Sequence, residues 1–150
     1  MANTYTRLNY HVVFSTKRRQ PTLQPAIRER LYPYFAATGR EKGIAVVEVG
    51  GVEDHVHLLI GIPAAMAVAK GVQLLKGNTS RWLHNTFGWD EFGCWQEGYG
   101  AFSIGSSQID RTVHYIRTQE DHHRQESFEI EYIRFLDTHG IEYDPKYVFD

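Results

Sequence analysis

The order in which strand-like and helix-like patterns follow one another constrains this chain most. Residues 10–16 (YHVVFST) are β-branched and aromatic, which predicts a strand, and a helical pattern follows at 24–42. Strand-like runs at 44–49 and 55–60 are joined by a short link that begins at Gly50-Gly51, which predicts a hairpin. A helix at 64–87 and a short aromatic strand at 99–103 complete a β-α-β-β-α-β order. This order predicts an α+β fold with a split βαβ, ferredoxin-like sheet.

Additional helices follow this unit toward the C-terminus. Ser107-Gln108-Ile109-Asp110 is read as a capping box that starts a helix over 108–126, and a last helix is expected at 128–138. Inside the two earlier helices, Pro33 should kink or split the first, and glycines should weaken the middle of the second.

Length and composition favour one globular domain over residues 1–150. No apolar run approaches the roughly 20 residues of a membrane helix, and no signal-peptide core is visible. The single cysteine, Cys94, fits a reducing cytoplasm. The net charge of −2 argues against a protein that simply coats nucleic acid, but residues 1–42 hold eight Lys/Arg and two acids. The basic N-terminal third could therefore contact a polyanion.

The predicted strand at 55–60 carries two histidines at alternate positions. His55 and His57 should face the same side of the sheet, about 6.5 to 7 Å apart, because side chains alternate along a strand. Val56, Leu58 and Ile60 should face the other side. Two imidazoles at this spacing can converge on one metal ion, although two partly exposed histidines on an edge strand would give the same pattern.

The predicted helix at 108–126 carries a second polar group. Tyr115, Gln119 and His122 fall on one stripe of that helix, with His123 at its edge. A solvated helix face would also explain them. If both groups form one site, His55, His57 and the Gln119 amide oxygen could bind a divalent cation. The hydroxyl of Tyr115 could then reach a phosphate bound to that cation and form a phosphotyrosine ester.

These residues resemble a known family, the single-tyrosine HUH transposases of small insertion sequences, which includes the REP-associated tyrosine transposases. The resemblance covers nearly the whole chain and rests on four segments: Tyr10-His11-Val12-Val13-Phe14, His55-Val56-His57-Leu58, Trp95-Gln96-Glu97-Gly98-Tyr99, and Tyr115-Ile116-Arg117-Thr118-Gln119 with His122-His123.

The resemblance implies a metal-dependent endonuclease and strand transferase for single-stranded DNA. It implies cutting beside a subterminal hairpin, a 5′-phosphotyrosine on Tyr115 and a free 3′ hydroxyl. It also implies Mg²⁺ or Mn²⁺ held by His55, His57 and Gln119, with His122 and His123 as a second layer around the metal. A cytoplasmic homodimer, with the tyrosine helix able to act in the partner's site, completes the expectation.

Contacts to DNA are assigned from charge and aromatic content. Lys17, Arg18 and Arg19 follow the first strand, and Lys76 and Arg81 lie on the second helix, where they could bind phosphates. Four large aromatics could stack on bases or belong to the core: Trp82, Trp89, Phe92 and Trp95.

The alternative function is a non-catalytic domain that binds single-stranded nucleic acid or a hairpin, similar to an RNA-recognition module. In that interpretation Tyr10, Phe14 and Phe102 would present aromatic rings on an open sheet. The histidine pair and the Tyr-Gln helix would then be coincidence.

Overall fold

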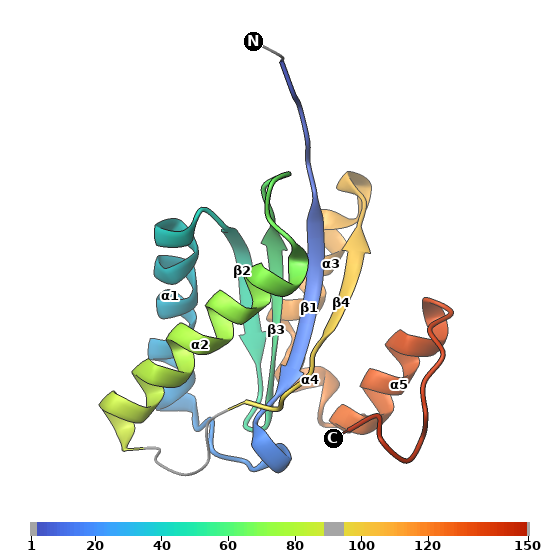
Figure 1. Cartoon of the computed structure of the whole chain (residues 1–150). Coiled ribbons are helices and arrows are strands. Elements are labelled where there is room, and N and C mark those ends of the chain that lie inside the picture. The colour runs from blue at the N-terminus through green and yellow to red at the C-terminus, as the bar shows by residue number, and fades with distance from the viewer. Residues whose placement is uncertain (1–2, 89–94, 150) are drawn as a thin grey trace.

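Four short strands pair into one antiparallel sheet in the spatial order β2-β3-β1-β4 (Figure 1). The computed structural model describes residues 3–88 and 95–149. The strands are β1 (Asn9–Ser15), β2 (Ala45–Gly51), β3 (His55–Gly61) and β4 (Gly100–Ile104). Each helical crossover joins two strands that have a third, antiparallel strand between them. This is the split βαβ arrangement, so the ferredoxin-like prediction is confirmed.

Two long helices, α1 (Pro25–Lys42) and α2 (Val68–Phe87), cover one face of the sheet (Figure 1). Val56, Leu58 and Ile60 of β3 are fully buried on that face, as their alternation predicts. They pack with apolar side chains of β1 and of both helices, among them Val12, Phe14, Leu31, Phe35, Leu75 and Leu83. This is the larger of the two apolar clusters, and it anchors the strand that carries the histidines.

The two long helices differ from the sequence expectation in where α2 begins and in the absence of breaks. Pro33 does not split α1, because its side of the helix is exposed and water can bond the carbonyl group that loses its partner. Helix α2 begins at Val68, four residues later than expected, and it is not broken at Gly71 or Gly77. Packing explains the glycine at position 71, since a Cβ there would lie 2.6 Å from the Ile62 side chain.

The opposite face of the sheet is covered by α3 (Ile109–Arg117), α4 (Gln119–His122) and α5 (Phe128–Thr138). A single helix over 108–126 is therefore wrong, because the chain breaks at Thr118. The side chains of Thr118 and Gln119 both donate to the Tyr115 carbonyl oxygen, and the Thr118 hydroxyl also donates to the His114 carbonyl oxygen. Such side-chain bonds compete with the helix ladder.

The predicted cap of this segment is also displaced. Ser106–Gln108 forms a short 3-10 turn, and the Gln108 side-chain oxygen accepts a bond from the Gly105 backbone N–H at 3.2 Å. Ser107 does not cap α3.

Helices lie on both faces of the sheet, so the described strands present no open aromatic surface of the kind an RNA-recognition module uses. Phe14 is 0% exposed and Phe102 is 2% exposed, so the placement of these rings as a base-stacking platform is wrong. Tyr10 is half-buried against the core. Among the residues that the structure describes, no helix has the length and apolar content to cross a membrane.

Candidate active site

Strand β3 points both of its histidines toward the face under α4 and α5, and both are fully buried. Each uses its Nδ1 for a neighbour outside the cluster. His55 Nδ1 lies 2.7 Å from Asp54 Oδ1, and His57 Nδ1 lies 2.8 Å from Nε2 of His11 on β1. Such outer contacts fix the orientation of a metal-binding imidazole. Here they aim both Nε2 atoms at the same point.

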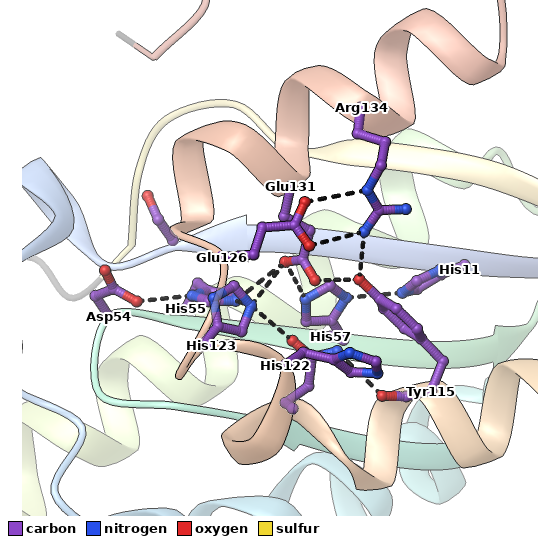
Figure 2. Close-up of polar contacts among 12 residues, drawn as sticks. His11, Asp54, His55, His57, Tyr115, His122, His123, Glu126, Glu131 and Arg134 are labelled. Carbon is purple, nitrogen blue, oxygen red and sulfur yellow. Dashed lines mark hydrogen bonds and ion pairs between the residues drawn. The ribbon is translucent and has the colours of Figure 1, made fainter.

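Two residues from the C-terminal segment meet this pair. One carboxylate oxygen of Glu131, on α5, lies 2.9 Å from His57 Nε2, 3.0 Å from His123 Nε2 and 3.3 Å from His55 Nε2 (Figure 2). All four ligand atoms lie within 4.8 Å of one another. Three imidazole nitrogens and one buried carboxylate oxygen could bind a divalent transition-metal ion.

The two predicted neighbours of the tyrosine occupy different places around this cluster. Gln119 is almost fully buried, and its amide oxygen lies 3.0 Å from His123 Nε2. It therefore contacts the cluster at His123. His122 lies outside, with its ring 4.5 Å from the Tyr115 ring and its Nε2 3.2 Å from the Thr118 hydroxyl.

The hydroxyl of Tyr115 lies directly beside the cluster in the same chain (Figure 2). It donates to the second carboxylate oxygen of Glu131 and accepts a bond from Arg134 Nη2 at 3.0 Å. Its ring centroid is 5.8 Å from that of His57. The close fit of α3 on the sheet allows this, since a Cβ at Gly50 would lie 2.1 Å from the Ile116 carbonyl oxygen.

The pKa values of the site residues are shifted by burial and by the contact of one carboxylate with three imidazoles. Burial lowers the pKa of His57 to about 4, against the opposing pull of Glu131. Burial alone would raise the pKa of Glu131, but the surrounding histidines hold it well below its usual range. Burial and the Glu131 carboxylate together raise the pKa of Tyr115 above its ordinary value. The phenol is therefore held in its protonated form next to an anion.

Sequence reasoning missed Glu131, Arg134 and the role of His11. Glu131 does carry a signal, because it occupies the i+3 position of a stripe that includes Phe128, Tyr132 and Leu136. An acid in a buried stripe indicates a partner for its charge. His123 was expected behind the ligands, but the break at Thr118 brings it among them.

The expected DNA-contacting cations divide into exposed and internally bonded groups. Lys17, Arg18 and Arg81 are exposed. Arg19 instead pairs with Glu129 of α5. The ammonium group of Lys76 donates to three carbonyl oxygens, of Gln96, Glu97 and Gly98, at 2.6 to 3.2 Å.

Two of the four expected stacking aromatics have internal partners. Trp95 is buried against Phe14, and Trp82 stacks on Tyr34. Trp89 and Phe92 lie outside the described residues, as does Cys94.

Fold and site together define a class: an α+β domain that holds a tyrosine hydroxyl against a buried group of possible metal ligands. The family model described as "Transposase IS200 like" matches residues 4–119. This chain belongs to that transposase family. His123, Glu131 and Arg134 lie beyond the matched residues.

Individual relatives agree with the family assignment. The chain is 28% identical over 112 residues to the transposase for insertion sequence element IS200 of Salmonella typhimurium, covering 71% of this chain and 74% of that protein. It is 23% identical over 121 residues to the ISDra2 transposase TnpA of Deinococcus radiodurans, covering 77% and 86%.

Two solved structures share the fold. A transposase structure from Deinococcus radiodurans superposes with a TM-score of 0.63 at 22% identity, covering 78% of this chain and 96% of that one. A REP-associated tyrosine transposase bound to a REP hairpin superposes with a TM-score of 0.56 at 13% identity, covering 77% and 68%.

Proposed function

We propose that this chain, acting as one domain over residues 1–150, is a metal-dependent tyrosine transposase that nicks and rejoins single-stranded DNA beside hairpins. One observation supports this most directly: the Tyr115 hydroxyl lies against the His55–His57–His123–Glu131 cluster within a single chain. In this proposal Tyr115 acts in the site of its own subunit. We also propose a cytoplasmic homodimer, in which α3 could act in the partner's site instead.

The chemistry is a transfer of a phosphoryl ester from DNA to the tyrosine. The Tyr115 phenol oxygen attacks the scissile phosphorus, the P–O3′ bond breaks, and a 5′-phosphotyrosine forms. The Glu131 carboxylate orients the phenol through its hydrogen bond, and the phenol proton is released to water as the new P–O bond forms. The departing 3′ oxygen takes a proton from water and becomes a free 3′ hydroxyl. Because the ester bond energy is retained, this hydroxyl can attack the phosphotyrosine and rejoin a strand.

The residues present fit a divalent cation, either Mg²⁺ or Mn²⁺. His55, His57, His123 and Glu131 would hold it, and Gln119 lies beside them as the further candidate ligand. When bound, such a cation would polarise the scissile phosphate and offset the charge that develops on it. Three imidazoles among the donors favour Mn²⁺, because Mg²⁺ prefers oxygen ligands.

Hairpin binding is proposed from the relative that is bound to a REP hairpin. On this chain, Lys17, Arg18 and Arg81 are the exposed cations of the predicted set and would contact phosphates. Arg19 and Lys76 would contribute by holding the surrounding loops, since their charges already meet internal partners.

The test uses single-stranded oligonucleotides that tile the DNA flanking the gene, incubated with the full chain and Mn²⁺. A 3′ label should move with the protein on a denaturing gel, and a 5′ label should mark a shorter strand with a free 3′ hydroxyl. Tyr115→Phe should form no adduct and still bind the DNA, whereas Tyr132→Phe, which alters a buried tyrosine of α5, should form it normally. An adduct with Tyr115→Phe would refute this nucleophile. Hairpin binding without any wild-type adduct would favour the non-catalytic alternative.

A further inference from the structure

A cavity adjoins Tyr115, and its lining includes neither His55, His57 nor Glu131. It has a volume of about 420 Å³ and lies between β4, the start of α3 and the end of α5. Tyr115 and Arg134 form one wall, so a group bound there would lie next to the reacting hydroxyl. Its volume is within the range of about 300 to 1,000 Å³ that is usual for small-ligand sites.

The charge of this cavity is opposite to that of its surroundings. Residues 104–150 hold ten acids and five Lys/Arg, yet none of the residues that line the cavity is Asp or Glu. Its cations are Arg111 of α3 and Arg134 of α5. Arg134 is held by Glu126 at 3.1 and 3.3 Å, whereas Arg111 is exposed and has no ion pair among the described residues. An anion is therefore the ligand that this cavity favours.

Aromatic rings form another part of the cavity. Phe102 stacks with Phe135 at 5.3 Å between centroids and with His139 at 4.6 Å, with interplanar angles of 19° and 30°. His139 is exposed, and Ser103 and Gln108 also line the space. Flat rings beside a phosphate-binding cation are the combination that recognises an unpaired nucleotide.

We propose that this cavity binds one nucleotide that flanks the scissile phosphate, with Arg111 contacting a backbone phosphate and the exposed ring of His139 contacting the base, while the buried Phe102 supports that ring from behind. The assignment rests on the proposed single-stranded DNA chemistry and extends it, because it names where one neighbouring nucleotide is held. Position supports this ligand class: Tyr115 and Arg134 line the cavity, so a strand whose phosphate reaches Tyr115 would place a neighbouring nucleotide beside it.

The first experiment measures binding of the tiled single-stranded oligonucleotides to Tyr115→Phe protein, which cannot cut them. Adding Arg111→Ala should weaken binding at least about tenfold and reduce the slope of log affinity against log salt by about one. The matched control is Arg117→Ala, on the same helix, whose guanidinium pairs with Glu48 at 2.9 Å. It should change affinity less than about twofold. Equal losses in both variants would overturn the assignment.

The second experiment identifies the nucleotide. Once the cleaved bond is mapped with wild-type protein, abasic residues are placed on either side of it and at distant positions. One flanking abasic site should weaken binding at least about fivefold, and His139→Ala should remove most of that penalty. Equal penalties at flanking and distant positions would overturn the base contact.

The two proposals fail in different ways. If the wild type forms no adduct but only Arg111→Ala weakens binding, the transposase chemistry fails and the cavity stands as a single-stranded DNA site. If the adduct forms and Arg111→Ala behaves like Arg117→Ala, the chemistry stands and the cavity assignment fails.

Discussion

The two faces of β3 carry opposite chemistry on one short strand. Val56, Leu58 and Ile60 lie among apolar side chains under α1 and α2, while His55 and His57 lie beside a carboxylate under α4 and α5. Both sets are completely buried. Apolar burial contributes roughly 25 cal/mol for each Å² removed from water. Burial of imidazoles and a carboxylate costs free energy unless each group is partnered.

This contrast indicates that the two faces of β3 have different roles. The apolar face supplies the stability that keeps β3 in place. The polar face is arranged for chemistry, with Asp54 and His11 orienting the two imidazoles from outside. Substitution by alanine should therefore lower activity at the histidine positions of β3 and lower stability at its apolar positions.

The largest effect is expected on the polar face. His57→Ala should lower the rate of adduct formation at least about 100-fold, equivalent to about 2.7 kcal/mol of transition-state stabilisation, because it removes a proposed metal ligand. The measurement is single-turnover adduct formation with Mn²⁺, corrected for the folded fraction by circular dichroism. A variant that reacts at the wild-type rate would remove His57 from the site and break the contrast.

Metal binding gives a second comparison on the same face. Mn²⁺ at 100 times its dissociation constant should stabilise the wild type by about 2.7 kcal/mol, and Glu131→Gln should lose most of this gain because the anionic donor is gone. Thermal unfolding with Mn²⁺ or with a chelator measures it. The control is Glu129→Gln, on the same helix, which removes only a partly exposed ion pair with Arg19. Equal Mn²⁺ shifts in both variants would exclude Glu131 as a ligand.

The apolar face should respond in stability alone. Leu58→Ala removes a fully buried side chain next to His57 and should cost about 2 to 5 kcal/mol of unfolding free energy. Adduct formation per folded molecule should stay within about twofold of the wild type, since the imidazoles keep their positions. Denaturant unfolding and active-site titration separate the two quantities. A large loss of activity in the folded fraction would mean that the faces are coupled.

The smallest expected effect is a pH dependence of the metal-free protein. Burial holds the pKa of His57 at about 4, and burial together with His57 holds that of His11 well below 6.5. The unfolded chain therefore binds more protons than the folded chain as the pH falls below about 6.5. Stability should decrease between pH 7 and 5. His55 has a raised pKa and opposes this trend, because its contribution is lost as the pH rises.

His11→Gln tests this pH dependence, because it removes one buried imidazole and keeps a hydrogen-bond acceptor near His57. Urea unfolding with a chelator at pH 7, 6 and 5 should give a shallower pH dependence than in the wild type. His114→Gln, on the exposed surface of α3, is the control. A steeper dependence in His11→Gln would contradict the stated origin.

Much of the fold was predictable because its signals are local. The alternation in β3, the β2–β3 hairpin and the helical spacing of α1 and α2 follow from a few neighbouring residues each. The turn itself is displaced, because Gly50 and Gly51 pair with β3 inside β2 and the chain turns at 52–54. The error in the predicted 108–126 helix also has a local cause. The Thr118 hydroxyl bonds to helix carbonyl oxygens, and this side-chain competition leaves no mark in the helical periodicity.

Periodicity and residue chemistry along the chain predict the succession of strands and helices, the two-faced strand, and the histidine pair and tyrosine as the groups that meet. The completion of the cluster by Glu131 and His11 follows from packing, because these residues reach His57 from 74 and 46 residues away. Contacts across a sheet depend on how whole helices settle on it. No spacing in the sequence expresses that, and the cavity beside Tyr115 arises from the same packing.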